Sequence, residues 1–323
     1  GAAPFTFTPE PQQHSSAAAD QQHSAMVYAS EELRRDPGFV LSAVEADPCA
    51  LRYVAAALRE DEEFVKAAVA QNGLAFAGAA PQLLQDRNFT LAAVRIDGRA
   101  LSGALERYRG DKQVVLAAVL ARGDALMHAS AEMRANREVV LAAVESWGPA
   151  LRYASEQLRG DREVVLVAVR RWGLALQHAV DELKSDREVV LAAVTNDGLA
   201  LLHAACELSD DKELVLAAVG LWGAALEYAS DRLRGDRETV LVAVGRWGVA
   251  LQYAQPALKR DKEVVLAAVY TDGLSLPYAS PELRGDRDVV LSAVRSCGSA
   301  LAHASSQLRA SKEVALAAVR ARG

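Results

Sequence analysis

Histidine is the residue that first suggests a metal centre, and in this chain it recurs at a fixed spacing. His128, His178, His203 and His303 lie at multiples of 25 residues from one another, and tyrosines hold the same place elsewhere. Equivalent side chains in adjacent helical repeats lie about 8 to 10 Å apart, whereas two ligands of one zinc ion lie within about 4 Å of each other. We therefore expect no metal site, and we interpret these residues as rings at the edge of the core with hydrogen-bonded polar tips.

All four tryptophans occupy a second fixed place in the same period. Aspartate stands there in other repeats, and a position that accepts a carboxylate is rarely fully buried. We therefore expect half-exposed rings, which either cover the preceding repeat or form a partner-binding patch, since tryptophan is enriched among interface hot spots. The candidate partner-binding residues are Trp147, Trp172, Trp222 and Trp247, together with Phe5 and Phe7 near the N-terminus.

The elements that must position these side chains belong to one 25-residue phrase, read most cleanly from Asp161 to Ser185 as DREVVLVAVRRWGLALQHAVDELKS. It recurs without insertion or deletion, which is typical of stacked repeats. We number each repeat from its opening Asp, so that the tryptophans stand at position twelve and the rings at position eighteen. The 300 residues from Ser24 to Gly323 hold twelve such repeats.

Each repeat carries the signals of short helices. The opening Asp is a helix cap, and the apolar body around Val-Leu-x-Ala-Val favours a helix that is buried between its neighbours. A glycine at position thirteen predicts a stop in the left-handed conformation. The Ala-Leu-x-Tyr/His-Ala segment predicts a second short helix, and a one-turn segment follows it.

The sequence therefore predicts an all-α fold, a right-handed α-solenoid or superhelical stack of twelve 25-residue repeats spanning residues 24–323. Residues 1–23 are rich in Pro, Gln, Ser and Ala, and we expect an extended low-complexity N-terminal arm there.

Basic residues recur at positions two and twenty-four, which alone would indicate a phosphate-binding stripe. Acidic residues at positions one and three fall in the same turn, as in Asp161, Arg162 and Glu163. We therefore expect a solvated network of ion pairs at the boundary between repeats, in which each pair contributes little to stability.

Composition and motifs argue against several classes of function. The sequence contains no GxSxG, HExxH or phosphate-cradling glycine loop, so we expect no enzyme, cofactor or small-molecule substrate. The net charge of −6 makes nucleic acid an unexpected partner. No apolar run approaches the length of a transmembrane segment. The three cysteines lack metal-site or disulfide spacing, which favours an intracellular, reducing compartment.

The phrases DREVVLAAV at residues 186 to 194 and ALEYAS at residues 225 to 230 resemble the repeat family known as domain of unknown function 4116. The resemblance covers nearly everything from Ser24 to Gly323. It implies tandem short helical repeats of the kind found in algae, other protists and some bacteria, with no assigned reaction. Gly78 and Gly103 depart from the pattern, because they stand where the ring is usual.

We expect a non-catalytic scaffold that binds protein along the solenoid face and the N-terminal arm, as an accessory subunit of a larger assembly. An organellar membrane complex, with peripheral association, is a candidate assembly, since the chain begins with Gly rather than Met and a removed plastid or mitochondrial targeting segment would leave such a start. The alternative is an RNA-binding repeat protein. That alternative needs a recurring polar code at the variable positions, which hold Leu, Val, Pro, Ala and Arg without order.

Overall fold

A computed structural model describes residues 24–321, and all regular structure within that range is helical. The chain is an all-α repeat solenoid in which consecutive repeats pack against each other. It divides into two compact regions, Gly1–Tyr108 and Arg109–Gly323. Phe5 and Phe7 lie outside the described residues.

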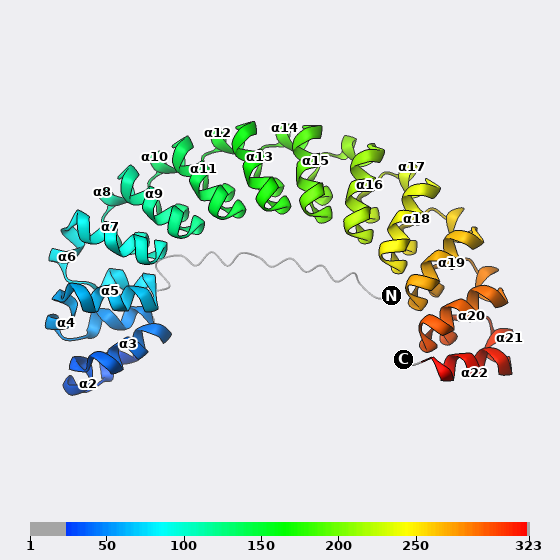
Figure 1. Cartoon of the computed structure of the whole chain (residues 1–323), viewed down its shortest axis with the longest axis horizontal. Helices are drawn as coiled ribbons and strands as arrows, with labels where there is room; N and C mark the ends of the chain where they lie inside the picture. The colour runs from blue at the N-terminus through cyan, green and yellow to red at the C-terminus, as the bar shows by residue number, and fades with distance from the viewer. Residues whose placement is uncertain (1–23, 322–323) are drawn as a thin grey trace. The chain divides into compact units, whose positions relative to one another are not determined.

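In the first region, each repeat contains a long α-helix, a 3₁₀-helix and a short α-helix (Figure 1). The long helices are α3 (Pro37–Ala46), α5 (Glu62–Gln71) and α7 (Arg87–Ile96). The 3₁₀-helices are η1 (Ala25–Tyr28), η2 (Pro48–Tyr53), η3 (Gly73–Gly78) and η4 (Gly98–Gly103). The short helices are α2 (Glu31–Arg35), α4 (Ala56–Glu60) and α6 (Pro81–Gln85), and α8 (Glu106–Arg109) ends the region.

The second region repeats the same three elements, and Figure 1 shows its long helices side by side in chain order. The long helices are α9 (Lys112–Ala121), α11 (Arg137–Ser146), α13 (Arg162–Arg171), α15 (Arg187–Asn196), α16 (Lys212–Leu221), α18 (Arg237–Arg246), α19 (Lys262–Thr271), α20 (Arg287–Ser296) and α22 (Lys312–Arg320). The 3₁₀-helices at the second-helix position are η5 (Gly123–His128), η6 (Gly148–Tyr153), η7 (Gly173–His178), η8 (Gly198–His203), η10 (Gly223–Tyr228), η11 (Gly248–Tyr253), η13 (Gly273–Tyr278) and η15 (Gly298–His303). The one-turn elements are α10 (Ala131–Arg134), α12 (Glu156–Arg159), α14 (Asp181–Lys184), η9 (Cys206–Asp210), α17 (Asp231–Arg234), η12 (Leu258–Arg260), η14 (Leu283–Gly285) and α21 (Ser306–Arg309).

The opening Asp caps the long helix as predicted. In the repeat that begins at Asp161, its carboxylate accepts hydrogen bonds from the amides of Glu163 at 3.0 Å and Val164 at 3.2 Å. These are two of the amides that have no partner within a helix. Such caps contribute about 1 kcal/mol each, so the start of a capped long helix is specified locally. Ser311, the predicted cap of α22, makes no side-chain capping hydrogen bond.

The glycine at position thirteen does not act as we predicted from the sequence. No residue among those described has a positive φ, so these glycines do not end the long helices in the left-handed conformation. They allow close packing instead. A Cβ atom at Gly123 would lie 2.5 Å from the carbonyl oxygen of Ala143, and one at Gly173 would lie 2.5 Å from that of Ala193. Glycine is required because the next long helix presses its backbone against this point.

Consecutive repeats are also joined by a recurring backbone hydrogen bond. The amide of Ser155 donates to the carbonyl of Arg134 at 2.9 Å, and the amide of Ser305 donates to that of Arg284 at 2.9 Å. The core between repeats consists of small and branched side chains, such as Val165, which is fully buried. Hydrogen bonds and packing therefore both follow the 25-residue period.

A candidate protein-interaction surface

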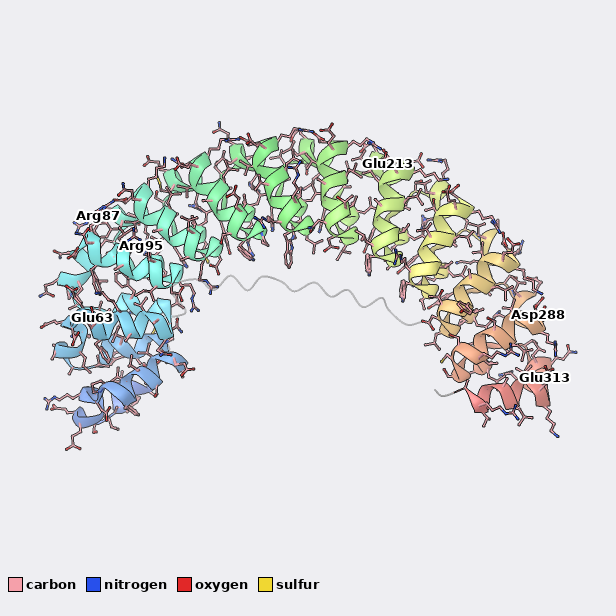
Figure 2. The ribbon with its side chains drawn as sticks, viewed as in Figure 1. Glu63, Arg87, Arg95, Glu213, Asp288 and Glu313 are labelled. Atoms are coloured by element: carbon pink, nitrogen blue, oxygen red, sulfur yellow. The ribbon has the colours of Figure 1, made fainter. Side chains whose placement is uncertain are left out.

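The N-terminal ends of the long helices carry the expected ion pairs. In the second region, the cation at position two bridges the acids at positions one and three of the next repeat. Arg162 Nε lies 2.8 Å from Asp186, and its guanidinium also pairs with Glu188. Glu213 and Asp288, which belong to the same ladder, lie at this end of the helices in Figure 2.

Lysine serves the ladder as well as arginine. Lys212 lies 2.8 Å from both Asp236 and Glu238. Its hydrogen bond, together with that of the Thr239 hydroxyl, lowers the pKa of Asp236 to about 2. The charges at this end of the stack thus neutralise each other, and the prediction of an ion-pair network is confirmed for positions one to three.

Position twenty-four does not belong to this network in the way we expected. In six of these arginines the Nε atom is buried and lacks a hydrogen-bond partner among the described residues, as in Arg134 and Arg159. Where an ion pair forms at this position, it joins an acid of the same short helix: Lys184 lies 3.0 Å from Asp181, and Arg234 lies 2.6 Å from Asp231.

Position twelve is the cap of the 3₁₀-helix, a role that the sequence alone did not reveal. The carboxylates of Asp197 and Asp272 each accept a hydrogen bond at 2.9 Å from the amide two residues later. Asp47, Asn72 and Asp97 do the same in the first region. This role explains why acidic residues recur at the position.

The tryptophan side chains do not form this cap. At Trp147, Trp172, Trp222 and Trp247, no side-chain hydrogen bond caps the following 3₁₀-helix. Replacing a capping side chain by an apolar one costs about 0.5 to 2 kcal/mol. The tryptophan rings must therefore offset this loss of stability, either by packing against the stack or by serving as a binding surface.

The predicted half-exposure of the tryptophans is confirmed. Trp172 is 50% exposed, Trp222 is 39%, and Trp147 and Trp247 are 36% each. Their Cβ atoms pack beside the position-thirteen glycine of the preceding repeat, as Trp172 does beside Gly148. The Trp222 ring stacks on Tyr228 with centroids 6.5 Å apart. Part of each ring thus covers the stack, and part faces solvent.

Other exposed apolar side chains extend this surface. Leu120 is 67% exposed, Leu221 is 57% and Tyr270 is 82%, and all three end long helices of the second region. We call the tryptophan edge the surface formed by Leu120, Trp147, Trp172, Leu221, Trp222, Trp247 and Tyr270. A ten-residue helix is about 15 Å long, so this edge is well separated from the ion-pair ladder at the opposite helix ends.

At two positions of the tryptophan edge, the packing of the repeats does not require glycine. Gly220 and Gly245 stand at position ten of α16 and α18, and an added Cβ at either would meet no atom within 4 Å. Glycine inside a helix costs about 0.5 to 1 kcal/mol relative to alanine. Sequence reasoning treated position ten as merely variable. The signal it missed was a glycine away from the stop position, two residues before an exposed tryptophan.

The cations on this edge have no carboxylate ladder beside them. Arg170 and Arg171 precede Trp172, and Arg246 precedes Trp247; all three are exposed. The nearby acids Asp197 and Asp272 already accept amide hydrogen bonds as caps. Glu145, two residues before Trp147, is an exposed carboxylate on the same edge. The edge is therefore apolar and aromatic, with scattered charge that is mostly positive.

Most position-eighteen rings are half-buried, as expected, whereas Tyr28, Tyr53 and His303 are exposed. Burial lowers the pKa of His178 to about 4, and Arg152, His203, Arg159 and Lys184 add to the effect by charge repulsion. Burial also lowers the pKa of His128 and of His203. These rings are therefore neutral packing groups at pH 7. Within residues 24–321, no group of three potential ligands could hold a metal ion.

No helix in the described range is both long and apolar enough to cross a bilayer. No curated protein and no solved structure matches the chain. The family model described as domain of unknown function (DUF4116) matches it in seven overlapping segments, residues 61–109, 86–134, 111–159, 161–208, 211–258, 236–284 and 286–323. Since these segments together cover most of the sequence, the chain belongs to the DUF4116 family.

Proposed function

We propose that the protein is a non-catalytic helical-repeat scaffold that binds a protein partner along the tryptophan edge, as an accessory subunit of a larger assembly. The observation that carries this proposal is the placement of all four tryptophans at a capping position. Asp caps the same helix in neighbouring repeats, so the fold alone favours Asp there. A binding surface supplies the reason for tryptophan, because its large ring buries much area on association.

The glycines narrow the docking region to the repeats of α16 and α18. Gly220 and Gly245 leave open space beside Trp222 and Trp247. A glycine on an exposed helix face lets another backbone approach closely. We therefore place the centre of the interface on these two repeats rather than on those of Trp147 and Trp172.

The charge on the edge indicates the chemistry of the partner. Arg170, Arg171 and Arg246 add positive charge to an aromatic surface. A partner segment with apolar residues for the rings and carboxylates for the arginines matches this pattern. We also propose an organellar assembly, on the ground of the family resemblance alone.

The experiment compares two matched double variants in affinity capture from an extract of the source cells, with quantitative mass spectrometry. Trp222→Asp/Trp247→Asp removes two rings and restores two native-type caps. Met127→Asp/Leu202→Asp makes the same chemical change at side chains that are 48% and 47% exposed on the 3₁₀-helices. We expect the same proteins to be captured by the wild type and the control, and to be lost from the tryptophan variant.

Two results would contradict the proposal. Equal capture by all three proteins would show that the tryptophans bind nothing. Capture that disappears on ribonuclease treatment and at moderate salt would assign the edge to RNA instead.

A further inference from the structure

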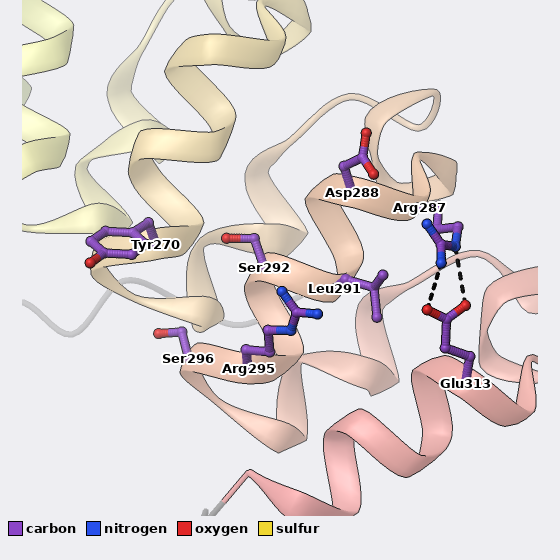
Figure 3. A pocket seen from close by; sticks show the side chains of 8 residues that line it. All are labelled: Tyr270, Arg287, Asp288, Leu291, Ser292, Arg295, Ser296 and Glu313. Atoms are coloured by element: carbon purple, nitrogen blue, oxygen red, sulfur yellow. Dashed lines mark hydrogen bonds and ion pairs between the residues drawn. The ribbon is translucent and has the colours of Figure 1, made fainter.

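A cavity lies away from the four tryptophans, at the long helices α19, α20 and α22. It has a volume of about 630 Å³ and is lined by Tyr270, Arg287, Ser292, Arg295, Ser296 and Glu313, with Asp288 and Leu291 (Figure 3). This volume lies in the range of small-molecule sites, about 300 to 1,000 Å³.

Most of the charges that line the cavity are already neutralised. The Arg287 guanidinium pairs with the Glu313 carboxylate, with contacts of 2.5 and 3.1 Å. Asp288 pairs with Lys262, whose Nζ lies 3.0 Å away. Arg295 remains, and no hydrogen bond or ion pair to its guanidinium occurs within residues 24–321. The lining thus carries one uncompensated positive charge.

Hydroxyl groups stand beside this charge. Figure 3 shows the Arg295 side chain along α20, with the hydroxyls of Ser292 and Ser296 on the flank of α20 that faces Tyr270. The Ser296 hydroxyl oxygen accepts a hydrogen bond from the Gly273 amide at 3.1 Å, so its proton is available to another acceptor. Ser292 stands where the preceding repeats of the second region have Ala or Val, so the repeat does not require a hydroxyl there.

The rest of the lining is apolar. Leu291 is only 6% exposed and closes the floor, while Tyr270 is 82% exposed and offers its ring as a wall. A ligand that fits this site combines a small anionic group with an apolar or aromatic body.

We propose that this cavity, the Arg295 pocket, binds a monocarboxylate carried on an aromatic or apolar body. The planar guanidinium of Arg295 matches a carboxylate in a bidentate arrangement. The serine hydroxyls donate to the carboxylate oxygens, and the body packs against Tyr270 and Leu291. A carboxylate fits better than a phosphate dianion, because Arg295 is the one unpaired cation of the pocket, while the lining as a whole has no net charge: Arg287 and Arg295 are balanced by Asp288 and Glu313. This inference does not depend on the four tryptophans, although Tyr270 belongs both to the tryptophan edge and to this pocket.

The test is isothermal titration of the full chain with 2-naphthoate, with neutral 2-naphthamide and inorganic phosphate as comparison probes. In the variant Arg295→Gln, we expect the affinity for 2-naphthoate to fall about ten- to a hundredfold, as the loss of a charge-assisted bidentate contact predicts. Arg95→Gln is the matched control, since it removes an exposed arginine at the same repeat position in the first region, and we expect it to leave the affinity unchanged. Both variants should keep the wild-type melting temperature, because both side chains are exposed.

Further variants and probes test the other contacts of the pocket. Ser292→Ala should weaken binding a few-fold, and Tyr270→Ala should weaken 2-naphthoate more than acetate. N-acetylphenylalanine represents the C-terminus of a peptide. Tighter binding of N-acetylphenylalanine than of 2-naphthoate would indicate that the ligand is a peptide carboxylate. Tighter binding of 2-naphthoate would indicate a free aryl carboxylate. Either result upholds the proposal. Absence of 2-naphthoate binding, equal affinity in Arg295→Gln and wild type, or tighter binding of the amide or of phosphate would overturn it.

Discussion

The two regions of the chain differ in how they use position eighteen. In the second region it holds tyrosine or histidine rings, which are half-buried except for the exposed His303. In the first region it holds the exposed Tyr28 and Tyr53 and then Gly78 and Gly103, and neighbouring 3₁₀-helices meet backbone to backbone at the two glycines. A Cβ at Gly103 would lie 2.6 Å from the amide nitrogen of Ala77, and one at Gly78 would lie 2.8 Å from the Cβ of Leu51. Neighbouring 3₁₀-helices can thus be separated by a ring at position eighteen, or they can pack directly against each other through glycine.

The interior of the first region supplies the bulk that its glycines lack. Phe64 and Phe89 stand at position four, where the second region has Val, Leu or Thr, and Phe76 replaces leucine at position sixteen. Phe76 is fully buried and its ring centroid lies 6.0 Å from that of Phe89. In these repeats of the first region, the aromatic side chains thus lie in the core of the stack rather than at its edge.

Position twelve separates the regions in the same sense. In the first region, Asp47, Asn72 and Asp97 all cap a 3₁₀-helix. In the second region, Asp197 and Asp272 keep the cap, and four tryptophans stand at this position without one. The comparison indicates that the first region uses this position for its own structure, and that four repeats of the second region use it for a surface. Partner binding should therefore belong to the second region.

The largest effect should follow from placing a ring at one of the two glycines that hold position eighteen in the first region. Gly103→Tyr forces a side chain against the Ala77 backbone, so we expect the free energy of unfolding to fall by about 3 kcal/mol in chemical denaturation. His178→Tyr is the control, because position eighteen of the second region already accepts a ring, and its cost should stay below about 1 kcal/mol. Similar losses for both variants would mean that the spacing of the repeats does not differ.

The next effect is a pH dependence confined to the ring-spaced region. The pKa of His178 is lowered in the folded state to about 4, so its contribution to stability is complete above pH 6.5 and is lost as the pH falls toward 4. Between pH 7 and pH 5 we expect wild type to lose about 1 kcal/mol more than His178→Tyr, since the partly exposed ring feels solvent screening. Parallel pH profiles for the two proteins, measured by denaturation, would rule out a neutral buried imidazole.

A smaller change of stability should accompany a loss of binding at the glycines of the tryptophan edge. Gly220→Ala/Gly245→Ala should raise the free energy of unfolding by about 1 kcal/mol, because alanine favours the helix and meets no neighbour. The same variant should capture less partner. Gly173→Ala is the opposite control, since its methyl group collides with the Ala193 carbonyl and should destabilise the stack. Increased stability with undiminished capture would remove the glycines from the interface and leave the tryptophans to be tested separately.

The smallest effect concerns the ion-pair ladder, which lacks a cation at position two of the repeat that begins at Asp61. Glu62 stands there beside Glu63. Glu62→Arg should extend the ladder toward Asp86 and stabilise the first region by about 0.5 kcal/mol, less at high salt. Glu62→Gln separates the loss of repulsion from the new pair. If both variants gain equally at low and high salt, the ladder contributes nothing there.

Much of the fold is predictable from the sequence because its signals are local. Asp161 predicts a cap through its own side chain, and the apolar run after it predicts a helix by composition alone. The meaning of Gly173 depends on a neighbour one repeat away, so its role in close packing could not be derived from propensity. Helix propensity alone predicted that Gly173 ends a helix, whereas in the structure Gly173 packs closely against the next long helix.

The candidate site was predictable only in part for the same reason. The half-exposure of Trp172 followed from aspartate at the same position in other repeats. That this position caps a 3₁₀-helix required the hydrogen bond made by Asp197. The open space at Gly220 and the uncompensated charge at Arg295 both depend on what neighbouring helices leave empty, which spacing along the chain does not encode.

The most direct test of the account is the free energy of unfolding of Trp172→Asp, measured by chemical denaturation against wild type. The account holds that this tryptophan serves a surface and forgoes a cap, so the variant should be as stable as wild type or more stable by up to about 1 kcal/mol. A loss of about 2 kcal/mol or more would contradict it, since the ring would then be needed to hold the repeats together.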